Sequence, residues 1–384
     1  MTAKLSKQEK EFFEHKLEAI RDKVDLEVDD PNSMDFALPS PKEIFDHLNK
    51  YVIGQERAKK ILSVVAHNHY KRLIIYRDSG FEKRLDKTNC LLLGPTGSGK
   101  TYLVKKLAEF LGVPHYIADA SGLTAAGYVG KDVESLVEGL INNCNGNYDA
   151  AATGIIFIDE FDKIAKHKGV GKSNKDIGGE SVQQALLKLI EGTTVEIEKQ
   201  SGTFSKMKMQ IDTSNILIIV GGAFVNLEEI IAERMKIKKS SNLGFGAHED
   251  EGVKIDHTLL KHAIVQDVEE FGFIPELLGR LPLIATLDEL SEEDLYNILT
   301  QVKGNLVDQY QQLFDFSKKT LVFEDEALRE IAKTAKKLKT GARSLKTIME
   351  TVLLDAMFEI EDMTITKEYV AEKVQTQFFD RPED

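Results

Sequence analysis

Eight consecutive residues combine three glycines with a lysine and two threonines, a set of groups suited to holding an anion. They are Gly94, Pro95, Thr96, Gly97, Ser98, Gly99, Lys100 and Thr101. Backbone N–H groups beside glycine can turn inward around a phosphate, and the lysine ammonium adds positive charge. The spacing fits Gly-x-x-x-x-Gly-Lys-Thr, in which the lysine reaches the β- and γ-phosphates and the threonine hydroxyl holds Mg²⁺.

The segments on either side of residues 94–101 predict the elements that must position them. The apolar run at 90–93 predicts a buried strand. Behind the loop, apolar residues recur at helical spacing until Gly112 and Pro114 end the helix. These apolar residues are Leu103, Val104, Leu107, Ala108 and Leu111. Strand, glycine loop and helix in this order predict a binding site for a nucleoside triphosphate and Mg²⁺.

A second apolar strand, at 155–160, ends in two carboxylates, Asp159 and Glu160. The C-terminal ends of strands in open α/β sheets are where ligands bind. Asp159 is suited to hold Mg²⁺ through water, and Glu160 to accept a proton from an attacking water. Two adjacent acids can also be solvated turn residues, but the phosphate loop upstream favours the catalytic interpretation.

Hydrolysis also needs a positive charge near the γ-phosphate as negative charge develops there. Arg280, in a Gly-Arg-Leu-Pro turn, and Arg343, which opens a helix after Gly341 and Ala342, are the candidates. Taken alone, each is as readily a surface arginine, so the two residues by themselves leave both interpretations open.

The bulk composition excludes several other classes of protein. The 384 residues are 42% hydrophobic and 29% charged, which is ordinary for a globular protein with room for two or three domains. The net charge of −13 argues against a surface built mainly to bind nucleic acid, although a local basic channel is compatible with it. Cys90 and Cys144 alone supply neither a disulfide framework nor a zinc cluster. Without an apolar signal segment or a run of about 18 apolar residues, we expect a cytoplasmic protein that makes no membrane contact.

Apolar strands alternate with amphipathic helices up to about residue 285. Further strands are predicted at 114–118 and 215–220, a hairpin around 199–206, and helices at 56–77 and 180–191. A capping box from Ser40 to Glu43, with proline at the first helical position, starts another helix. This alternation predicts an α/β fold in which helices cover both faces of a parallel sheet.

Beyond Thr286 the pattern becomes mostly helical. We predict helices at 292–313, 325–338 and 343–360, with a short strand at 320–323. The chain is therefore expected to have three parts. These are a charged N-terminal helix (4–28) with its linker, at 1–39, a large domain at 40–285, and a smaller helical domain at 286–384.

Several longer motifs resemble those of the AAA+ ATPases and, within them, of the ClpX family, the unfoldase partners of ClpP peptidases. The resemblance covers roughly residues 40–375 and includes the phosphate loop and the strand at 155–160. The other matching stretches are Val52-Ile-Gly-Gln, Gly127-Tyr-Val-Gly, residues 179–192, Gly221-Gly-Ala-Phe, residues 273–282 and Thr340-Gly-Ala-Arg.

The resemblance implies a homohexameric ring that hydrolyses ATP with Mg²⁺. It implies that Arg280 reaches a neighbour's nucleotide, that Arg343 senses nucleotide from the small domain, and that Thr101 and Asp159 hold the metal. It further implies roles for three other sets of residues. Val52 and Ile53 would flank the adenine, Tyr128 and Val129 would grip an unfolded or tagged polypeptide in the axial pore, and Leu243, Gly244 and Phe245 would dock on a ClpP-type peptidase. Without the resemblance, Tyr128 would be read as a core aromatic residue.

Three features depart from the family pattern. The sequence has no cysteine before Cys90, so we expect no N-terminal four-cysteine zinc domain and no zinc. The hairpin tip at 199–206 lacks the Arg-Lys-His trio of well-known members, so recognition of substrate tags is expected to differ. The strand before Gly221 and Gly222 offers no polar side chain at the usual sensor position.

The leading hypothesis is an ATP-dependent protein unfoldase that threads polypeptides into a ClpP-type peptidase. A stand-alone AAA+ chaperone without a peptidase is a second possibility. A nucleic-acid motor is a third, but it would need charged or stacking groups in the pore loop, and residues 126–130 carry no charge. The sequence does not identify the substrates, their tags or the adaptors.

Overall fold

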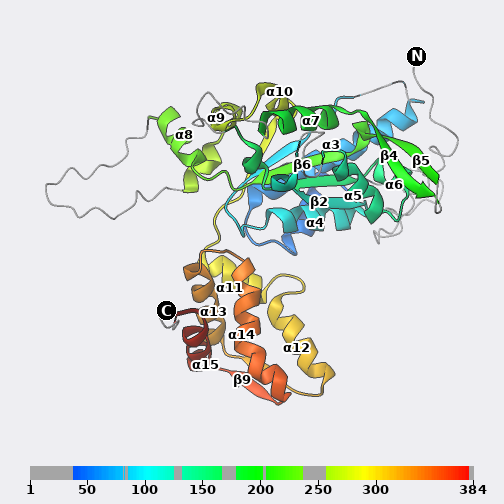
Figure 1. Ribbon diagram of the computed structural model, residues 1–384. Coiled ribbons are helices and arrows are strands. Elements are labelled where there is room, and N and C mark those ends of the chain that lie inside the picture. The colour runs from blue at the N-terminus through cyan, green and yellow to red at the C-terminus, as the bar shows by residue number, and fades with distance from the viewer. Residues whose placement is uncertain are drawn as a thin grey trace. The chain divides into compact units, whose positions relative to one another are not determined.

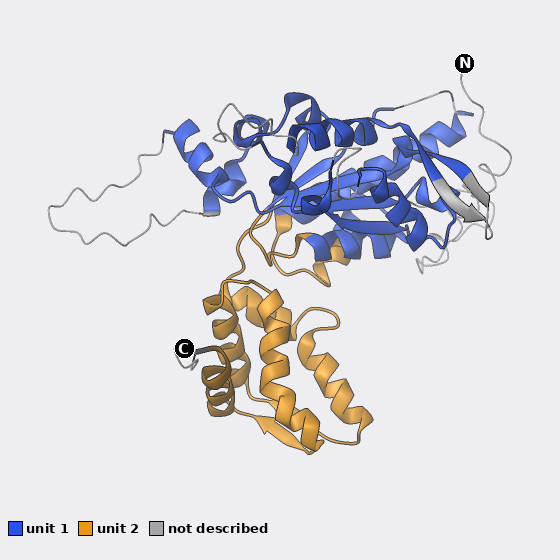
Figure 2. Ribbon diagram, viewed as in Figure 1, with its two compact units in different colours: residues 1–45, 57–93, 101–286 blue, residues 46–56, 94–100, 287–384 orange. Residues whose placement is uncertain are grey.

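The computed structural model describes residues 38–80, 82, 85–124, 132–166, 179–201, 205–236 and 257–379. It divides into two compact units (Figure 2). The large unit comprises residues up to Phe45, Arg57–Leu93 and Thr101–Thr286, and the small unit comprises Asp46–Glu56, Gly94–Lys100 and the chain from Leu287. Two short stretches that the sequence analysis gave to the large domain, 46–56 and 94–100, thus belong to the small unit.

The large unit is built on a parallel sheet of five strands (Figure 1). The strands are β1 (Cys90–Leu93), β2 (His115–Asp119), β3 (Ile155–Asp159), β6 (Leu217–Gly222) and β7 (Leu283–Thr286), in the order β2-β3-β6-β1-β7. The predicted parallel sheet is confirmed. The sequence analysis did not predict β7, a four-residue edge strand that pairs only with β1.

The three central strands, β1, β3 and β6, are buried on both faces, which explains why they are almost continuously apolar. Leu91, Ile156 and Val220 point to one face and join the helices α5 (Ser135–Asn143) and α7 (Gly179–Glu191) in one hydrophobic core. The residues next to them along the strands point to the other face, since successive side chains alternate, and they are fully buried as well.

Two of the remaining helices, at 56–78 and 100–111, are predicted from the sequence, and four shorter ones are not. These helices are α3 (Glu56–Asp78), α4 (Lys100–Leu111), α6 (Tyr148–Ala151), α8 (Leu227–Arg234), α9 (Val265–Phe271) and α10 (Pro275–Leu278). The helix α2 (Pro41–Asn49) begins at the predicted capping box: Ser40 N donates to Glu43 Oε2 at 2.7 Å and Glu43 N to Ser40 Oγ at 3.2 Å. The Ser40 hydroxyl lowers the pKa of the Glu43 carboxyl.

None of the described helices combines the length and apolar character that crossing a membrane requires.

The predicted hairpin is confirmed. It consists of β4 (Thr194–Ser201) and β5 (Ser205–Asp212), which pair antiparallel along their whole length. Val195, Ile197 and Ile211 are buried at its base and belong to the core of the large unit. The alternation of apolar and charged residues therefore reflects one buried and one solvated face.

The small unit is mostly helical, as predicted. Its elements are α11 (Glu292–Thr300), α12 (Leu306–Phe316), α13 (Asp325–Lys337), α14 (Arg343–Glu359) and α15 (Lys367–Val374), with the parallel strands β8 (Leu321–Phe323) and β9 (Met363–Ile365). The prediction of one helix over 292–313 is wrong. The chain breaks between α11 and α12 because Gly304 adopts a φ of +70° and the Asn305 side chain caps the second helix by accepting from Asp308 N at 2.9 Å.

Three basic side chains of the large unit meet at the turn Thr213–Ile216, between β5 and β6. His69 Nε2 donates to Asn215 O at 3.0 Å, Arg72 Nη2 to Ser214 O at 3.1 Å, and Lys87 Nζ to Ile216 O at 3.1 Å. Burial and the neighbouring Arg72 charge lower the pKa of Lys87 to about 7, and burial holds the pKa of His69 well below its usual range. The turn is therefore held by three side-chain hydrogen bonds. Two of the donors, His69 and Lys87, have lowered pKa values and bind a proton less readily than in water.

This arrangement predicts that the chain becomes more stable as the pH rises from about 7 to 9, below the pH at which Cys90 ionises in the unfolded state. In that window Lys87 is neutral in the folded state, where its pKa is about 7, but protonated in the unfolded state, where it is near 10.5. The unfolded state then binds more protons, so the free energy of unfolding rises by at most about 1.4 kcal/mol per pH unit. Urea denaturation followed by circular dichroism measures this slope.

Lys87→Met should flatten the slope in the same pH window. Lys208→Met, which replaces a lysine exposed at 67%, is the matched control and should leave the slope unchanged. Equal slopes for the wild-type chain and Lys87→Met would show that Lys87 is protonated in the folded protein.

Candidate nucleotide-binding site

The loop between β1 and α4 has the geometry expected of a phosphate-binding loop. Gly97 and Gly99 adopt φ values of +78° and +99°, which only glycine adopts without strain. Lys100 is buried, and its Nζ donates to Gly94 O at 2.6 Å and Pro95 O at 3.0 Å. The ammonium thus lies against the loop backbone. Among the described residues, the buried Ser98 hydroxyl has no hydrogen-bond partner, which leaves a polar group available to a ligand.

The two residues predicted to hold Mg²⁺ are brought together in the large unit. Thr101 Oγ1, in the first turn of α4, donates to Asp159 Oδ2 at 2.6 Å. Asp159 is the last residue of β3, and its other oxygen accepts from Glu160 N at 2.9 Å. A hydroxyl and a carboxylate oxygen at this separation are hard ligands of the kind Mg²⁺ prefers, so the residues present fit the ion.

Glu160 stands at a strained turn. Its φ is +53°, in the left-handed region that a non-glycine residue seldom adopts, and its side chain is exposed at the end of β3. Such strain clusters at functional sites, where the surrounding structure holds it in place. Here the buried Asp162 accepts from Ala223 N at 3.1 Å and fixes the chain just beyond the turn.

The same contact explains why glycine occupies the end of β6. A Cβ atom at Gly222 would lie 2.3 Å from Asp162 Oδ1, so no side chain fits there. The absence of a side chain at Gly222 follows from this close packing.

Within the small unit, the phosphate loop contacts the turn that precedes Arg343. Ala342 N donates to Gly97 O at 3.2 Å. The two backbones are so close that a Cβ at Gly97 would lie 2.2 Å from Thr340 O, and one at Gly341 would lie 2.7 Å from Gly97 O. Arg343, the first residue of α14, is exposed directly after this contact. Arg343 therefore follows a segment that is hydrogen-bonded to the loop.

The sequence analysis missed Gln55 as a residue of this site. Its side chain is buried and binds the Asp288 backbone twice, with Asp288 N donating to Oε1 at 2.7 Å and Nε2 donating to Asp288 O at 2.9 Å. Nε2 also lies 3.5 Å from Ser98 O, and the Gln55 backbone has a left-handed φ of +60°. Gln55 thus links the buried Val52 and half-buried Ile53 segment to the phosphate loop. Only its place in the Val52-Ile-Gly-Gln motif could have indicated it.

Arg280 lies apart from Thr101 and Asp159 in the large unit. Its carbonyl accepts from Asn89 Nδ2 at 3.2 Å, and Asn89 directly precedes β1, so Arg280 stands at the N-terminal edge of the sheet. Thr101 and Asp159 stand at the C-terminal edge. The side chain of Arg280 forms an ion pair with Glu191 at 2.8 Å.

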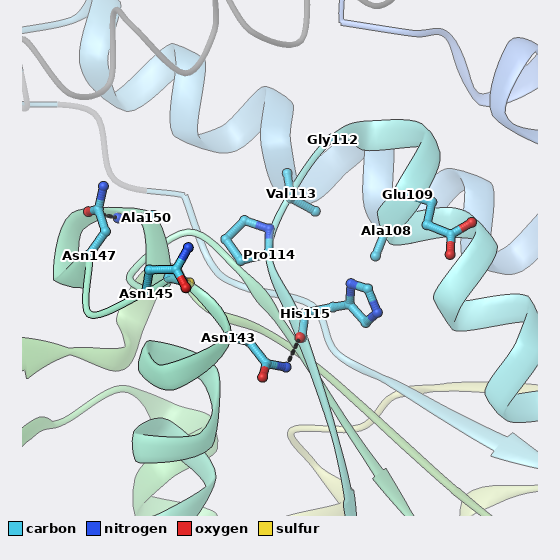
Figure 3. A pocket seen from close by; sticks show the side chains of 11 residues that line it. Ala108, Glu109, Gly112, Val113, Pro114, His115, Asn143, Asn145, Asn147 and Ala150 are labelled. Atoms are coloured by element: carbon cyan, nitrogen blue, oxygen red, sulfur yellow. Dashed lines mark hydrogen bonds between the residues drawn. The ribbon is translucent and has the colours of Figure 1, made fainter.

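A surface pocket lies where α4 ends and β2 begins (Figure 3). Glu109, His115, Asn143 and Asn147 are among its lining residues, and Asn143 Nδ2 donates to His115 O at 2.8 Å. This pocket contains none of the predicted site residues. Cys144 also lines it, and its Sγ donates to Leu140 O at 3.0 Å. Burial raises the pKa of the Cys90 thiol to about 12. Within the described ranges, no group of three or more acidic, histidine or cysteine side chains is arranged to hold a metal ion.

Two predicted sites lie outside the described residues. Tyr128 and Val129 fall in the range 125–131, and Leu243, Gly244 and Phe245 in the range 237–256. The helix predicted at 4–28 lies outside them as well. These assignments stay predictions.

Comparisons with known proteins agree with this geometry. Residues 85–284 match the family described as AAA domain (Cdc48 subfamily), and residues 290–370 match the C-terminal, D2-small domain of ClpB protein. A protein of Treponema denticola, the ATP-dependent Clp protease ATP-binding subunit ClpX, is 45% identical over 340 residues, which are 88% of this chain and 81% of that protein. The chain belongs to the ClpX family of AAA+ ATPases.

A second ClpX relative supports this assignment. The subunit of the same name from Borrelia duttonii is 46% identical over 341 residues, 88% of this chain and 78% of that protein. Membership of the ClpX family makes the chain an ATPase, and it confirms the resemblance drawn from the motifs.

The contact between the phosphate loop and the turn before Arg343 yields a prediction for Gly341→Ala. The new Cβ would lie 2.7 Å from Gly97 O, so the loop has to move. We expect ATP to bind about tenfold or more weakly, equivalent to about 1.4 kcal/mol. Titration with a fluorescent ATP analogue measures the affinity.

The matched control is Gly304→Ala. Gly304 also has a left-handed φ, of +70°, but the position that its Cβ would take has no neighbouring group within 4 Å. This variant should lower stability by about 1 kcal/mol and leave ATP affinity unchanged. Equal losses of affinity in both variants would show that backbone strain, and not the loop contact, is responsible.

Proposed function

We propose that this chain is an ATP-dependent protein unfoldase that forms a homohexameric ring and threads polypeptides through its axial pore into a ClpP-type peptidase. The observation that carries the proposal is the Thr101–Asp159 hydrogen bond of 2.6 Å at the end of the phosphate loop, in a chain with ClpX relatives over 88% of its length. Both relatives are named as ATP-binding subunits of an ATP-dependent Clp protease. These names favour a peptidase-coupled unfoldase over a stand-alone chaperone or a nucleic-acid motor.

Each nucleotide-site residue has a part in ATP hydrolysis. Lys100 exchanges its loop carbonyls for the β- and γ-phosphates of ATP, while Thr101 and Asp159 hold Mg²⁺. Bound Mg²⁺ supplies positive charge that offsets the charge on the phosphates. Glu160 accepts a proton from the attacking water. The 2.6 Å contact and the exposed position of Glu160 at the end of β3 support these roles.

Residues of the small unit contact the adenine base and respond to the state of the bound nucleotide. Val52 and Ile53 flank the adenine, and Gln55 keeps this segment next to the phosphate loop through its two bonds to Asp288. Arg343 senses the nucleotide. The hydrogen bond from Ala342 N to Gly97 O supports this role, because movement of the loop is passed directly to the start of α14.

Arg280 completes the site of a neighbouring subunit. It stands at the N-terminal edge of the sheet, whereas Thr101 and Asp159 stand at the C-terminal edge. A strand of four residues separates the two edges by about 13 Å, which an arginine cannot bridge within its own chain. A ring brings Arg280 to the γ-phosphate bound by the next subunit, where it stabilises the developing charge.

The residues outside the described part complete the proposal. Tyr128 and Val129 grip an unfolded or tagged polypeptide in the pore. The glycines at 127 and 130 give that loop freedom to swing. Leu243, Gly244 and Phe245 form an apolar stretch within a polar sequence, suited to a pocket on the peptidase. Six copies in a ring would add their individually weak contacts through effective concentration.

Glu160→Gln should bind ATP normally and hydrolyse it at least about 100-fold more slowly, because it removes the general base and keeps Asp159. Steady-state phosphate release measures the rate, and nucleotide titration measures the binding. Glu180→Gln, which replaces an exposed glutamate paired with Lys166, is the control and should hydrolyse ATP normally. Near-normal turnover in purified Glu160→Gln protein would place the base elsewhere.

Action of Arg280 in trans predicts complementation. Arg280→Ala and Glu160→Gln proteins should each be nearly inactive, but random mixed rings contain about a quarter of interfaces with both groups intact. Their ATPase rate should recover accordingly. If mixed rings are shown to form and no activity returns, Arg280 does not act across the subunit boundary.

Variants at Tyr128 and at Phe245 should separate the unfolding of a substrate from its degradation. Tyr128→Ala should keep most ATPase activity and lose most unfolding of a folded fluorescent substrate. Phe245→Ala should keep both and lose degradation by an added ClpP-type peptidase. Each variant serves as the control of the other. A parallel loss of ATPase activity and unfolding in Tyr128→Ala would mean that Tyr128 is structural.

A further inference from the structure

The side chain of Arg280 is held by a single carboxylate. Its Nε and Nη2 donate to Glu191 Oε1 at 3.0 Å and 2.8 Å. Glu191 is the last residue of α7, and both side chains are partly exposed, at 57% for Arg280 and 41% for Glu191. The pair is therefore accessible at the surface of the large unit.

The backbone of Arg280 is fixed independently of this pair. The flanking residues Leu278 and Leu281 are buried in the core, and Arg280 N donates to Leu277 O at 3.0 Å. The Arg280 carbonyl accepts from the buried Asn89, whose Oδ1 accepts in turn from Ile218 N at 3.2 Å. Only the orientation of the side chain remains to be set, and Glu191 is the group that sets it.

The pair leaves most of the guanidinium free to bind an anion. Arginine has five N–H donors, of which Glu191 takes two. Among the described residues, the guanidinium makes no further hydrogen bond, so Nη1 and one proton of Nη2 remain available. Glu191 can therefore hold one edge of the side chain while the other edge binds a phosphate oxygen.

We propose that Glu191 is a positioning residue that orients Arg280 toward the nucleotide bound by the neighbouring subunit. The proposal rests on the proposed action of Arg280 in trans. A free arginine side chain samples many rotamers, and Glu191 reduces that number before the neighbour's nucleotide arrives. Because the Arg280–Glu191 pair is exposed, its effect on the rate of ATP hydrolysis is modest, up to about fivefold.

In the otherwise wild-type chain, Glu191→Ala should lower the kcat of ATP hydrolysis about three- to fivefold and leave the KM for ATP within about twofold, because Arg280 acts on charge that develops in the transition state. Glu191→Gln keeps an acceptor oxygen and should recover at least half of the loss. In an Arg280→Ala background, Glu191→Ala should have no further effect. Glu180→Ala breaks a similarly exposed pair on the same helix, with Lys166 at 2.8 Å, and should leave kcat unchanged.

The deciding experiment places Glu191→Ala in one partner of a mixed ring. In mixtures of Glu160→Gln with Arg280→Ala chains, the working Arg280 comes from the Glu160→Gln chain. Adding Glu191→Ala to that chain should lower the rescued ATPase rate three- to fivefold, and adding it to the Arg280→Ala chain should leave the rate unchanged.

The outcomes separate the two proposals. An equal loss of rate in both placements would mean that Glu191 has a structural role, and a faster rate would mean that it inhibits Arg280. Either result overturns the positioning role of Glu191. Rescue in the parent mixture still supports the action of Arg280 in trans. No rescue in the parent mixture overturns trans action, and the positioning role with it. Thermal melting of each variant confirms that the chains compared are folded.

Discussion

The arrangement of this site depends on a phosphate loop that must satisfy two sets of contacts at once. Its ends are bound covalently to β1 and α4, whose other residues belong to the large unit. Its middle belongs to the small unit, where Gly97 O accepts from Ala342 N and no Cβ fits at Gly97 or Gly341. Within the small unit, a loop this closely packed cannot adjust to a triphosphate without affecting the turn before Arg343.

The parallel sheet keeps two groups of the proposed mechanism at opposite edges. The C-terminal edge carries Asp159, which accepts from Thr101, and the N-terminal edge carries Arg280. Because the strands keep these edges apart, the proposed role of Arg280 requires a second subunit. Glu191 adds to this division, because it holds the side chain of Arg280 at the edge where a neighbour would meet it. The proposed ring is consistent with this separation.

Patterns in the sequence predicted the elements whose formation depends on residues close together in the chain. The strands at β1 and β3, the start of α2 at Ser40 and the hairpin β4–β5 all follow from apolar period and capping, and they are confirmed. The continuous helix over 292–313 is wrong because Gly304 and Asn305 allow a turn that apolar period alone does not reveal. The bonds of Gln55 to Asp288 and of Arg280 to Glu191 join residues far apart in the chain, so no local pattern contains them. The pore and docking residues lie outside the described ranges and stay predictions.

The central claim is that ATP hydrolysis at this site drives the unfolding of proteins. The most direct test follows a folded fluorescent protein that carries an unstructured tail, mixed with the wild-type chain in the absence of peptidase. We predict that fluorescence falls with ATP and Mg²⁺, in proportion to phosphate released, and stays constant with ADP or a non-hydrolysable ATP analogue. If fluorescence stays constant for a panel of such tails while ATP is hydrolysed, or falls equally with the analogue, the account is contradicted.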